Sequence, residues 1–349
     1  MNIKAVAKLA GVSTATVSRT INGTAKISPK TEERVRRAIK SLNFYPDTNA
    51  RALGSGRSSL YGLIISDITN PFYPELIKAF EDIAIAHNQE ILVANTNYDP
   101  DRMKICVTRM LQRKVDGVAI MTSEMDEALI KDFSRRNIPL AFLDAGTPGP
   151  GVSSVHINYA AGIEAAMRHL IGLGHQRIAF IAGPLRLASA RARFRTFKKI
   201  QAREHLAIHP GLIEVGNHRV DGGRDAMLRI LDSATGSDAM PTAVLCSNDL
   251  TAIGAMGAIH ERKLAIPRDI SVMGFDNIQL SAYTMPSLST VSVPRAELAK
   301  AAFRALLHAQ ERGLAKLPEG QKYSVDTTLV LRNSTGPVRE PKTSAARKK

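Results

Sequence analysis

The sequence has no tryptophan, only two cysteines and few aromatic residues, which make up 5% of its 349 residues. Cys106 and Cys246 lack metal-ligand spacing and lie within apolar stretches, so both are expected to be buried thiols. No apolar run of about 18 residues exists, and the N-terminus lacks the apolar core of a signal peptide. We therefore expect a soluble, cytoplasmic protein without a membrane span.

Apolar residues make up 44% of the chain, which is enough for a packed core and excludes global disorder. The length fits two or three domains. The net charge of +15 is uneven: residues 1–57 carry +8, residues 338–349 carry +4 and the long stretch between them carries +3. A basic end on a near-neutral body predicts a module that binds a polyanion, since phosphate contacts dominate nucleic-acid affinity. A solubilising surface is the alternative explanation.

Near the N-terminus, apolar residues have the spacing of a short helix, namely Ile3, Val6, Ala7, Leu9 and Ala10. Gly11 is expected to end this helix, and Ser13 to cap a second one. The second helix would turn Val17 and Ile21 toward the core. Two short helices joined by a tight turn containing glycine form the helix-turn-helix arrangement.

A third helix is expected to begin with Ser28 as N-cap and Pro29 at its first position. Its inward residues are Val35, Ala38, Ile39 and Leu42. We expect it to run to about Asn43, just before Tyr45 and Pro46.

The second helix begins with polar or small residues. In helix-turn-helix proteins this end of the second helix meets base edges in the major groove. Arg19 can bond a guanine bidentately, and the hydroxyl and amide side chains suit phosphates or bases. Each hydroxyl taken singly is also explained by helix capping. The candidate DNA contacts among these side chains are Ser13, Thr16, Ser18, Arg19 and Asn22.

The motif residues occur in a fixed order: Val6-Ala7, Ala10 to Arg19, Asn22-Gly23, Val35, Ala38, Leu42 to Pro46, and Ala50 to Leu53. This order resembles the headpiece of the LacI/GalR (lactose-repressor) family, and the resemblance extends to about residue 335. It implies that Thr14 and Ala15 set base preference and that Arg19 contacts a base.

The resemblance also places a hinge helix at residues 49–54, which in the family forms when operator DNA binds. Leu53 matches the leucine that wedges into the central minor-groove step and kinks the duplex. A loosely packed linker leucine is the alternative. Asn49 joins the candidate DNA contacts. We therefore expect a headpiece at residues 1–46 and a hinge with its linker at residues 47–59.

From residue 60, short β-rich runs alternate with amphipathic helical stretches, which predicts parallel sheets covered by helices. The expected strands are Leu60–Ile65, Glu90–Ala94, Gly117–Met121, Leu140–Leu143, Arg177–Ala182, Ala243–Cys246, Ile270–Gly274 and Ser324–Val330. The expected helices are Pro74–Ala86, Arg102–Arg113, Ala160–Leu173, Asp249–Arg262 and Ala296–Gln310. The expected fold is thus an all-α headpiece followed by an α/β core of two doubly wound subdomains.

This core, residues 60–337, resembles the family's periplasmic-binding-protein-like effector domain. Its expected parts are an N-subdomain at about residues 60–158 and 289–318, a C-subdomain at about 159–288 and 319–337, and a basic, disordered tail at 338–349. The tail has no leucine heptads, so a homodimer is expected rather than a tetramer.

Ligands of open α/β sheets bind at the carboxyl ends of the strands, so a cleft between two such lobes is the expected site. Polar residues follow the expected strands at Ser66 to Phe72, Thr122-Ser123, Asp144, Ser247 to Asp249 and Phe275-Asp276. The resemblance assigns effector contacts to Phe72, Asp144, Arg193, Asn248 and Asp276. Helix capping is the alternative role for the Asn248-Asp249 pair.

Two departures from the family pattern bear on the effector. The family commonly has Asp-Asn where this chain has Ile157-Asn158, and His218 is the nearest match to a ring-stacking aromatic. Cationic residues crowd the segments around the expected pocket: Arg186, Arg191, Arg193, Arg195, His218 and Arg219. Because guanidinium groups bind carboxylates and phosphates bidentately, a sugar acid or sugar phosphate is our first hypothesis, with a neutral sugar as the alternative. Arg186 and Arg195 also fit a solvated helix face.

These features predict a ligand-responsive, sequence-specific regulator, acting as a repressor on palindromic operator DNA in the nucleoid. A solute-binding protein would share the core but need a signal peptide and no headpiece. An α/β enzyme is the third possibility, although Gly-x-Gly-x-x-Gly, Gly-x-Ser-x-Gly and metal-spaced clusters are absent from the sequence. We expect no catalysis, no metal and no cofactor.

Overall fold

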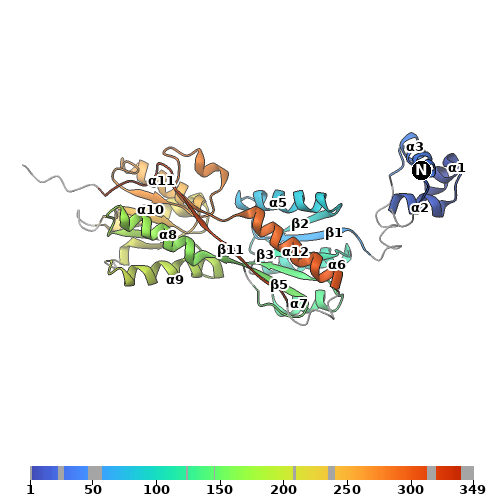
Figure 1. Cartoon of the computed structure of the whole chain (residues 1–349). Coiled ribbons are helices and arrows are strands. Elements are labelled where there is room, and N and C mark those ends of the chain that lie inside the picture. Colours follow the sequence, from blue (N-terminus) through green and yellow to red (C-terminus); the bar gives the residue numbers. More distant parts are fainter. Residues whose placement is uncertain are drawn as a thin grey trace, which may run out of the picture. The chain divides into compact units, whose positions relative to one another are not determined.

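The structure is a computed structural model that describes residues 2–22, 27–45, 57–122, 125–144, 146–206, 210–234, 240–312 and 320–338, with the backbone alone at residues 22, 210 and 312. The chain divides into two compact units, Met1–Ser59 and Leu60–Lys349, which are considered separately (Figure 1).

The first unit contains three helices, α1 (Ile3–Ala10), α2 (Thr14–Asn22) and α3 (Pro29–Ser41). Gly11 ends α1 in the left-handed conformation, with φ of 63°, which glycine adopts without strain. The hydroxyl of Ser13 accepts a hydrogen bond from the Thr16 amide at 3.1 Å, and Ser28 caps α3 in the same way. These caps and boundaries follow the expectation, except that Leu9 is 57% exposed rather than packed inward.

A small core holds this unit together. Its buried members are Val6, Ala7, Ala10, Val17, Val35 and Ala38, with residues such as Ile21 and Leu42 packed around them. The apolar face of each helix is therefore used internally. The N-terminal half of α2 keeps its polar face outward.

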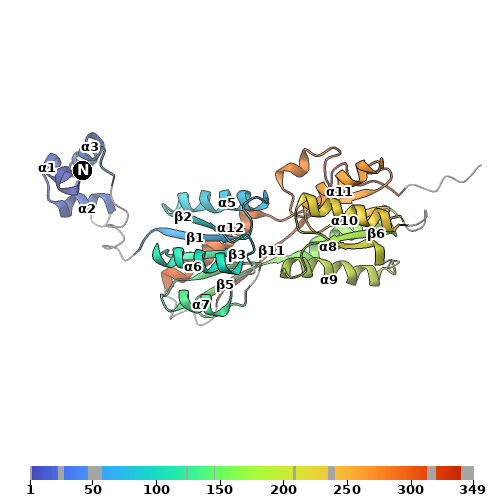
Figure 2. The same ribbon diagram turned by 180° about the vertical axis from the view of Figure 1, so that it is seen from behind.

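The second unit begins with an all-parallel sheet of six strands in the order β11-β5-β4-β3-β1-β2. Its elements are β1 (Leu60–Ile65), α5 (Phe72–Ala86), β2 (Glu90–Asn95), α6 (Pro100–Gln112), β3 (Gly117–Met121), α7 (Glu127–Ser134), β4 (Leu140–Leu143) and β5 (Val152–Asn158). We call this sheet and its helices the first lobe. The later helix α12 (Arg295–Arg312) also packs on it, beside α5 (Figures 1 and 2).

The second lobe is a parallel sheet of four strands in the order β7-β6-β8-β9. Its elements are α8 (Tyr159–Gly172), β6 (Ile178–Ala182), α9 (Ala188–Arg203), η1 (Pro210–Leu212), β7 (Ile213–Val215), α10 (Val220–Ser233), β8 (Ala243–Cys246), α11 (Asp249–Glu261), β9 (Ser271–Met273) and η2 (Gln279–Ala282). Both sheets are covered by helices on two faces, which explains why their strands read as continuous apolar runs.

Alternate side chains of a strand point to opposite faces of the sheet, and the two faces pack into different hydrophobic clusters. In β1, Tyr61, Leu63 and Ile65 point to one cluster and Ile64 to another. The first cluster continues into the second lobe beneath α8 and α9, so both lobes share one continuous apolar core. Within the described residues, no helix is long and apolar enough to cross a membrane.

The chain passes between the lobes at three places, and the last of them corrects an expectation. Residues 324–330 were expected to form one strand, and residues 319–337 to lie in the C-subdomain. Instead β11 (Lys322–Asp326) pairs with β5 in the first lobe, and β12 (Thr328–Val330) pairs antiparallel with β10 (Thr290–Ser292). Thr327 breaks the pairing, because its hydroxyl donates to the Asn158 carbonyl at 2.9 Å where β5 leaves the first sheet. The alternation of apolar residues in the sequence does not show that the chain changes its partner strand from β5 to β10 at this point.

Candidate functional sites

A cavity of about 80 Å³ lies between the two lobes of the second unit, at the carboxyl ends of their strands. The first lobe contributes Ser66, Asn70, Phe72, Tyr73, Tyr98, Met121, Thr122, Leu143 and Asp144. The second lobe contributes Leu187, Ala188, Ser189, Arg193, His218, Asn248 and Asp276, and Ile157, Tyr159 and Val293 line the cavity where the chain passes between lobes. The structure thus brings all six expected effector contacts to one cavity: Phe72, Asp144, Arg193, His218, Asn248 and Asp276.

Arg193 is the only arginine that lines this cavity among the described residues, and it is 5% exposed. Its guanidinium carbon lies 4.7 Å from the ring centroid of Tyr159 and 5.0 Å from that of Phe275. The closest oxygen of Asp276 is 3.8 Å from Nη1, which is too long for a direct hydrogen bond. Among the described residues, the buried Nε of Arg193 has no hydrogen-bond partner. Arg193 therefore lines the cavity with its hydrogen-bonding capacity incompletely used.

Two carboxylates face this arginine. Burial raises the pKa of Asp276 to about 7, although the positive charges of Arg193 and Arg295 oppose the shift. Burial also raises the pKa of Asp144, whereas the Tyr159 hydroxyl that donates to it and the charge of Arg193 act in the opposite direction. The cavity therefore holds two acidic groups for a single guanidinium.

His218 is buried as a neutral imidazole. Its Nε2 lies 2.9 Å from the hydroxyl of Ser247, and its backbone has a left-handed φ of 65°. Burial lowers the pKa of His218 to about 3, together with the nearby charges of Arg193 and Arg186. The ring fits only because residue 183 is glycine: a Cβ there would lie 1.8 Å from Nε2.

Asn248 has a structural task in addition to lining the cavity. Its side-chain oxygen accepts from the Thr251 amide at 2.9 Å and caps α11, and its amide donates to the His218 carbonyl at 3.1 Å. The neighbouring Asp249 does not line the cavity. It accepts from the Ile278 amide at 2.8 Å and from the hydroxyl of Thr290.

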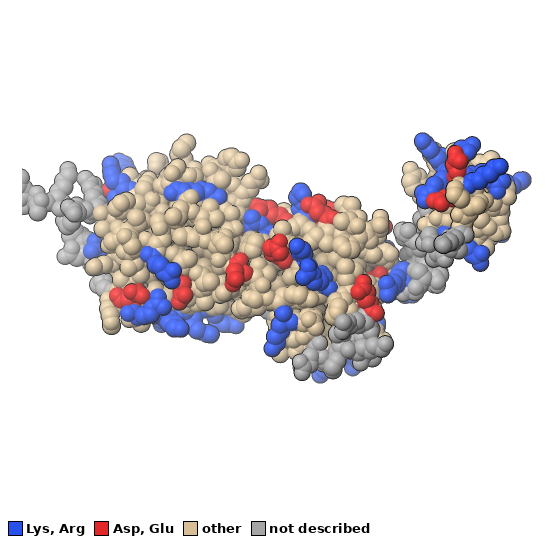
Figure 3. Space-filling view, viewed as in Figure 1, with Lys and Arg blue, Asp and Glu red and all other residues tan. Residues whose placement is uncertain are grey.

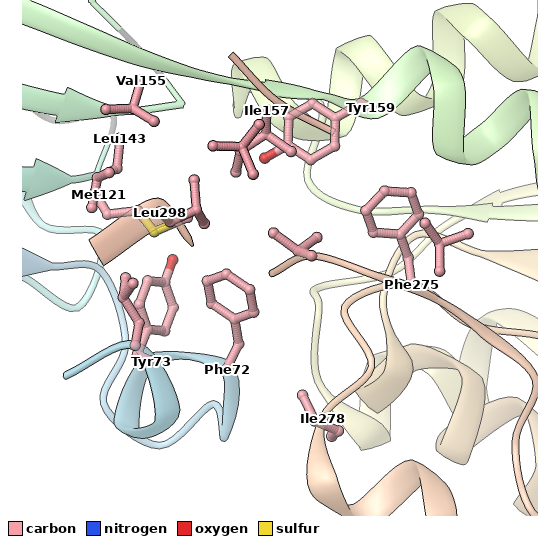
Figure 4. Close-up of a cluster of buried hydrophobic side chains, with 14 of the residues drawn as sticks. Phe72, Tyr73, Met121, Leu143, Val155, Ile157, Tyr159, Phe275, Ile278 and Leu298 are labelled. Carbon is pink, nitrogen blue, oxygen red and sulfur yellow. The ribbon is translucent and has the colours of Figure 1, made fainter. Parts of the chain in front are cut away.

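Aromatic side chains gather at the cavity, although the sequence predicted few stacking surfaces. Four of the chain's 17 phenylalanine and tyrosine residues line it: Phe72, Tyr73, Tyr98 and Tyr159. Figure 4 shows Phe72, Tyr73 and Tyr159 around one space, with Phe275 beside Tyr159. Sequence reasoning missed the three tyrosines. Tyr98 and Tyr159 follow the ends of β2 and β5, so the strand-end rule would have found Tyr159 had β5 been expected.

The other cationic residues of the expected pocket do not line it. Arg186 stacks over the ring of Tyr98 at 5.4 Å, and Arg219 pairs with Asp67 at 2.9 Å. Arg191 donates to the carbonyls of Leu185 and Arg186, and Arg195 is exposed on α9. Helical spacing explains the difference, because residues 191 and 195 point away from the face of α9 that carries Arg193.

The described residues contain no group of three or more His, Cys, Asp or Glu side chains placed to hold a metal ion. Cys106 and Cys246 are buried and free, as expected, and burial raises the pKa of both thiols. Neither thiol is prepared for reactive chemistry.

In the first unit, the start of α2 forms an outward face. Ser13, Thr14, Ala15 and Arg19 are exposed, and Thr16 and Ser18 are half-buried. Figure 3 shows basic side chains over the described surface of this unit, which suits contact with phosphates. The side chain of Asn22 and all of Asn49 and Leu53 lie outside the described residues, so their expected DNA contacts stay predictions.

Comparison with known proteins agrees with this arrangement. Residues 2–47 match the bacterial regulatory proteins of the lacI family, and residues 167–335 match a periplasmic binding protein-like domain. The HTH-type transcriptional repressor PurR of Histophilus somni (strain 2336) is 33% identical over 333 residues, which cover 95% of this chain and 98% of that protein. The chain belongs to the LacI family.

Solved structures of LacI-family type superimpose on most of the chain. The Lac repressor dimer bound to operator and the anti-inducer ONPF has a TM-score of 0.82 at 28% identity, covering 96% of this chain and 99% of that one. The complex of the regulator CelR with cellobiose has a TM-score of 0.70 at 26% identity, covering 96% and 99%. The expected family and fold class are thereby confirmed, and this LacI-family chain is a ligand-responsive DNA-binding transcription regulator.

Proposed function

We propose that this regulator represses transcription by binding a palindromic operator as a dimer, and that a small neutral polyhydroxylated effector, such as a sugar, occupies the cleft. The observation that carries the proposal is the polar outward face of α2, on a unit whose three helices pack around their own small core. Such a helix is free to enter a major groove.

For the DNA contacts, we assign Arg19 to a base and the hydroxyls of Ser13, Thr16 and Ser18 to phosphates or bases. Thr14 and Ala15 set base preference, and Asn22, Asn49 and Leu53 complete the proposed interface. One headpiece reads only a few base pairs, so a dimer on two half-sites multiplies specificity. The Lac repressor relative is likewise a dimer bound to operator.

The charges of the cavity favour a neutral ligand and count against our first hypothesis of a sugar acid or sugar phosphate. Asp144 and Asp276 already face the single Arg193, and the buried His218 is neutral, so an anionic ligand would add a third acidic group without a second cation. A hydroxyl can donate to a carboxylate while accepting from the guanidinium of Arg193. The aromatic rings then cover the apolar faces of the ligand. Cellobiose bound to CelR is a ligand of this class.

We further propose that the cleft binds its ligand without converting it, and that the protein works in the cytoplasm at the nucleoid. Asp144 accepts from the Tyr159 hydroxyl, and Asp276 faces Arg193. We therefore assign both carboxylates to binding polar groups and not to acid–base catalysis. The PurR relative is named for repression rather than for a reaction.

Two measurements test the proposal. Selection of random duplex DNA by the full chain should yield a palindrome, and recovery of sequences without paired half-sites would overturn the repressor assignment. A thermal-shift screen at pH 7 should show stabilisation by a neutral sugar and none by the matching sugar acid or sugar phosphate. Stabilisation by the anionic members alone would overturn the assigned effector class.

A further inference from the structure

One ion pair joins the two lobes at the edge of the cleft. Arg219 precedes α10 in the second lobe, and its Nη2 donates to Oδ2 of Asp67, which follows β1 in the first lobe, at 2.9 Å. The Asp67 side chain is 6% exposed and that of Arg219 is 52% exposed. Neither residue lines the cavity, so the pair is separate from the proposed effector contacts.

The Asp67 side chain is held from within the first lobe, and the backbone of Arg219 is held from within the second. The other carboxylate oxygen of Asp67 accepts from the amide and the hydroxyl of Thr69, at 3.0 and 2.6 Å. The backbone amide of Arg219 donates to Asn217 at 2.9 Å. Burial opposes ionisation of Asp67, but the bonds from Thr69 and Arg219 outweigh it and lower the pKa of this carboxyl. The carboxylate is therefore oriented before it meets Arg219, and it is ionised at neutral pH.

Other contacts between described residues also cross between the lobes. Arg295 of α12 donates to the carbonyls of Asp276 and Asn277 at 2.6 and 2.9 Å, and further contacts lie beside the cavity. Arg186 of the second lobe lies over the ring of Tyr98 of the first, at 5.4 Å. Glu75, at the start of α5, accepts from the Gln279 amide of the second lobe at 3.0 Å. These contacts involve the loops beside the cavity, so they are made only while the lobes are close together.

We propose that Asp67 and Arg219 form a latch that holds the lobes closed without an effector. This inference rests on the proposed function, in which a small effector occupies the cleft between the lobes. The latch makes the closed arrangement the starting state, so an effector must enter through transient opening, and its release is slowed by the same ion pair. Ion pairs of this exposure shift an equilibrium by about two- to fivefold. The latch therefore favours the closed arrangement of the lobes but still permits opening.

The test measures lobe separation with neither effector nor DNA present. Cysteines introduced at the exposed positions Ala86 and Ala202, near the far ends of α5 and α9, carry spin labels, and labelled chains are diluted with unlabelled chains in the dimer. Cys106 and Cys246 are buried, which keeps the native thiols unlabelled. Pulsed electron resonance then gives the populations of short and long distances.

Arg219→Ala should raise the ratio of long to short distances about two- to fivefold, and Arg219→Lys should restore part of the difference. Asp67→Asn keeps an oxygen for Thr69 and should act like Arg219→Ala. Salt at molar concentration should change the distance distribution of the parent toward that of Arg219→Ala, because salt screens the ion pair. The distribution of Arg219→Ala itself should not change. The matched control is Arg224→Ala, because Arg224 has 45% exposure and pairs with Glu261 inside the second lobe.

Equal distance distributions for the parent and Arg219→Ala, at low and high salt, would overturn the latch. An equal shift in Arg224→Ala would also overturn the latch. The shift would then result from the loss of a positive charge and not from the loss of a contact between the lobes. Operator selection is unaffected by either outcome, so failure of the latch is distinguishable from failure of the proposed function.

Discussion

Arg193 and Asp276 face each other across 3.8 Å inside the cleft, both nearly buried, without a direct hydrogen bond. Within the described part of the chain, Nε of Arg193 is unpartnered, and burial raises the pKa of Asp276 to about 7 against the positive charges of Arg193 and Arg295. A ligand hydroxyl between them would satisfy both groups. An incomplete ion pair of this kind favours a bound molecule, because binding supplies the missing partners.

Arg193→Met keeps a long buried side chain and removes the charge and all donors. We expect affinity for the neutral sugar identified by screening to fall by about 1.5–3 kcal/mol, the usual contribution of a hydrogen bond to a charged group. Arg195→Met, two residues along α9 on the exposed face, is the matched control and should bind like the parent. Titration calorimetry measures both, and equal affinities in the two variants would remove Arg193 from the site.

Asp276 should make stability depend on pH. Its folded pKa of about 7 lies above the ordinary value of 3.8, so the folded state binds more protons between those values. The free energy of unfolding therefore falls as pH rises through this interval, by up to about 3 kcal/mol between about pH 5 and pH 8. Asp276→Asn should remove this slope. Urea denaturation across the interval gives the difference, and parallel pH profiles for the two proteins would contradict the assignment.

Gly183→Ala should displace His218. The new methyl group would occupy the position of the ring, so the hydrogen bond to Ser247 is lost and stability falls by about 1–3 kcal/mol. Gly257→Ala is the matched control: this exposed helical glycine has no neighbour within 4 Å, and the change should stabilise α11 by about 0.5–1 kcal/mol. Thermal unfolding compares them. An unchanged melting temperature in Gly183→Ala would show that His218 moves freely.

Arg19→Ala should weaken binding to the selected operator by about 1–3 kcal/mol and relax preference at one base pair of each half-site. Arg37→Ala removes the same charge from α3, where Arg37 pairs with Glu33, and should weaken all sequences alike. Fluorescence anisotropy at one salt concentration, on the operator and single-base variants, separates the two effects. If Arg19→Ala weakened binding to all sequences equally, Arg19 would contact a phosphate and not a base.

Local features of the structure could be read from the sequence. Gly11, Ser13 and Ser28 act through neighbours one to three residues away, so their capping roles were predictable. Buried parallel strands such as β1 and β3 appeared as apolar runs with the observed bounds. The rule that ligands bind at strand ends selected Asp144 and Asp276, which do line the cavity.

Features that depend on distant partners could not be read in the same way. The sequence places Arg186, Arg191, Arg193 and Arg219 in two short segments, and their crowding suggested a cationic pocket. The family resemblance singled out Arg193, but only the tertiary structure shows that the other three arginines do not line the cavity and that Arg219 pairs with Asp67, 152 residues away. Likewise, the alternating apolar pattern around Thr327 forms two strands in two different sheets, β11 and β12. They are separated where the Thr327 hydroxyl donates to the Asn158 carbonyl of β5. The order of residues along the chain determined the family and those helices and strands, such as α1, β1 and β3, that follow from short-range periodicity and spacing. Only the folded arrangement decided the charge of the cleft, because that charge depends on which side chains meet across two lobes.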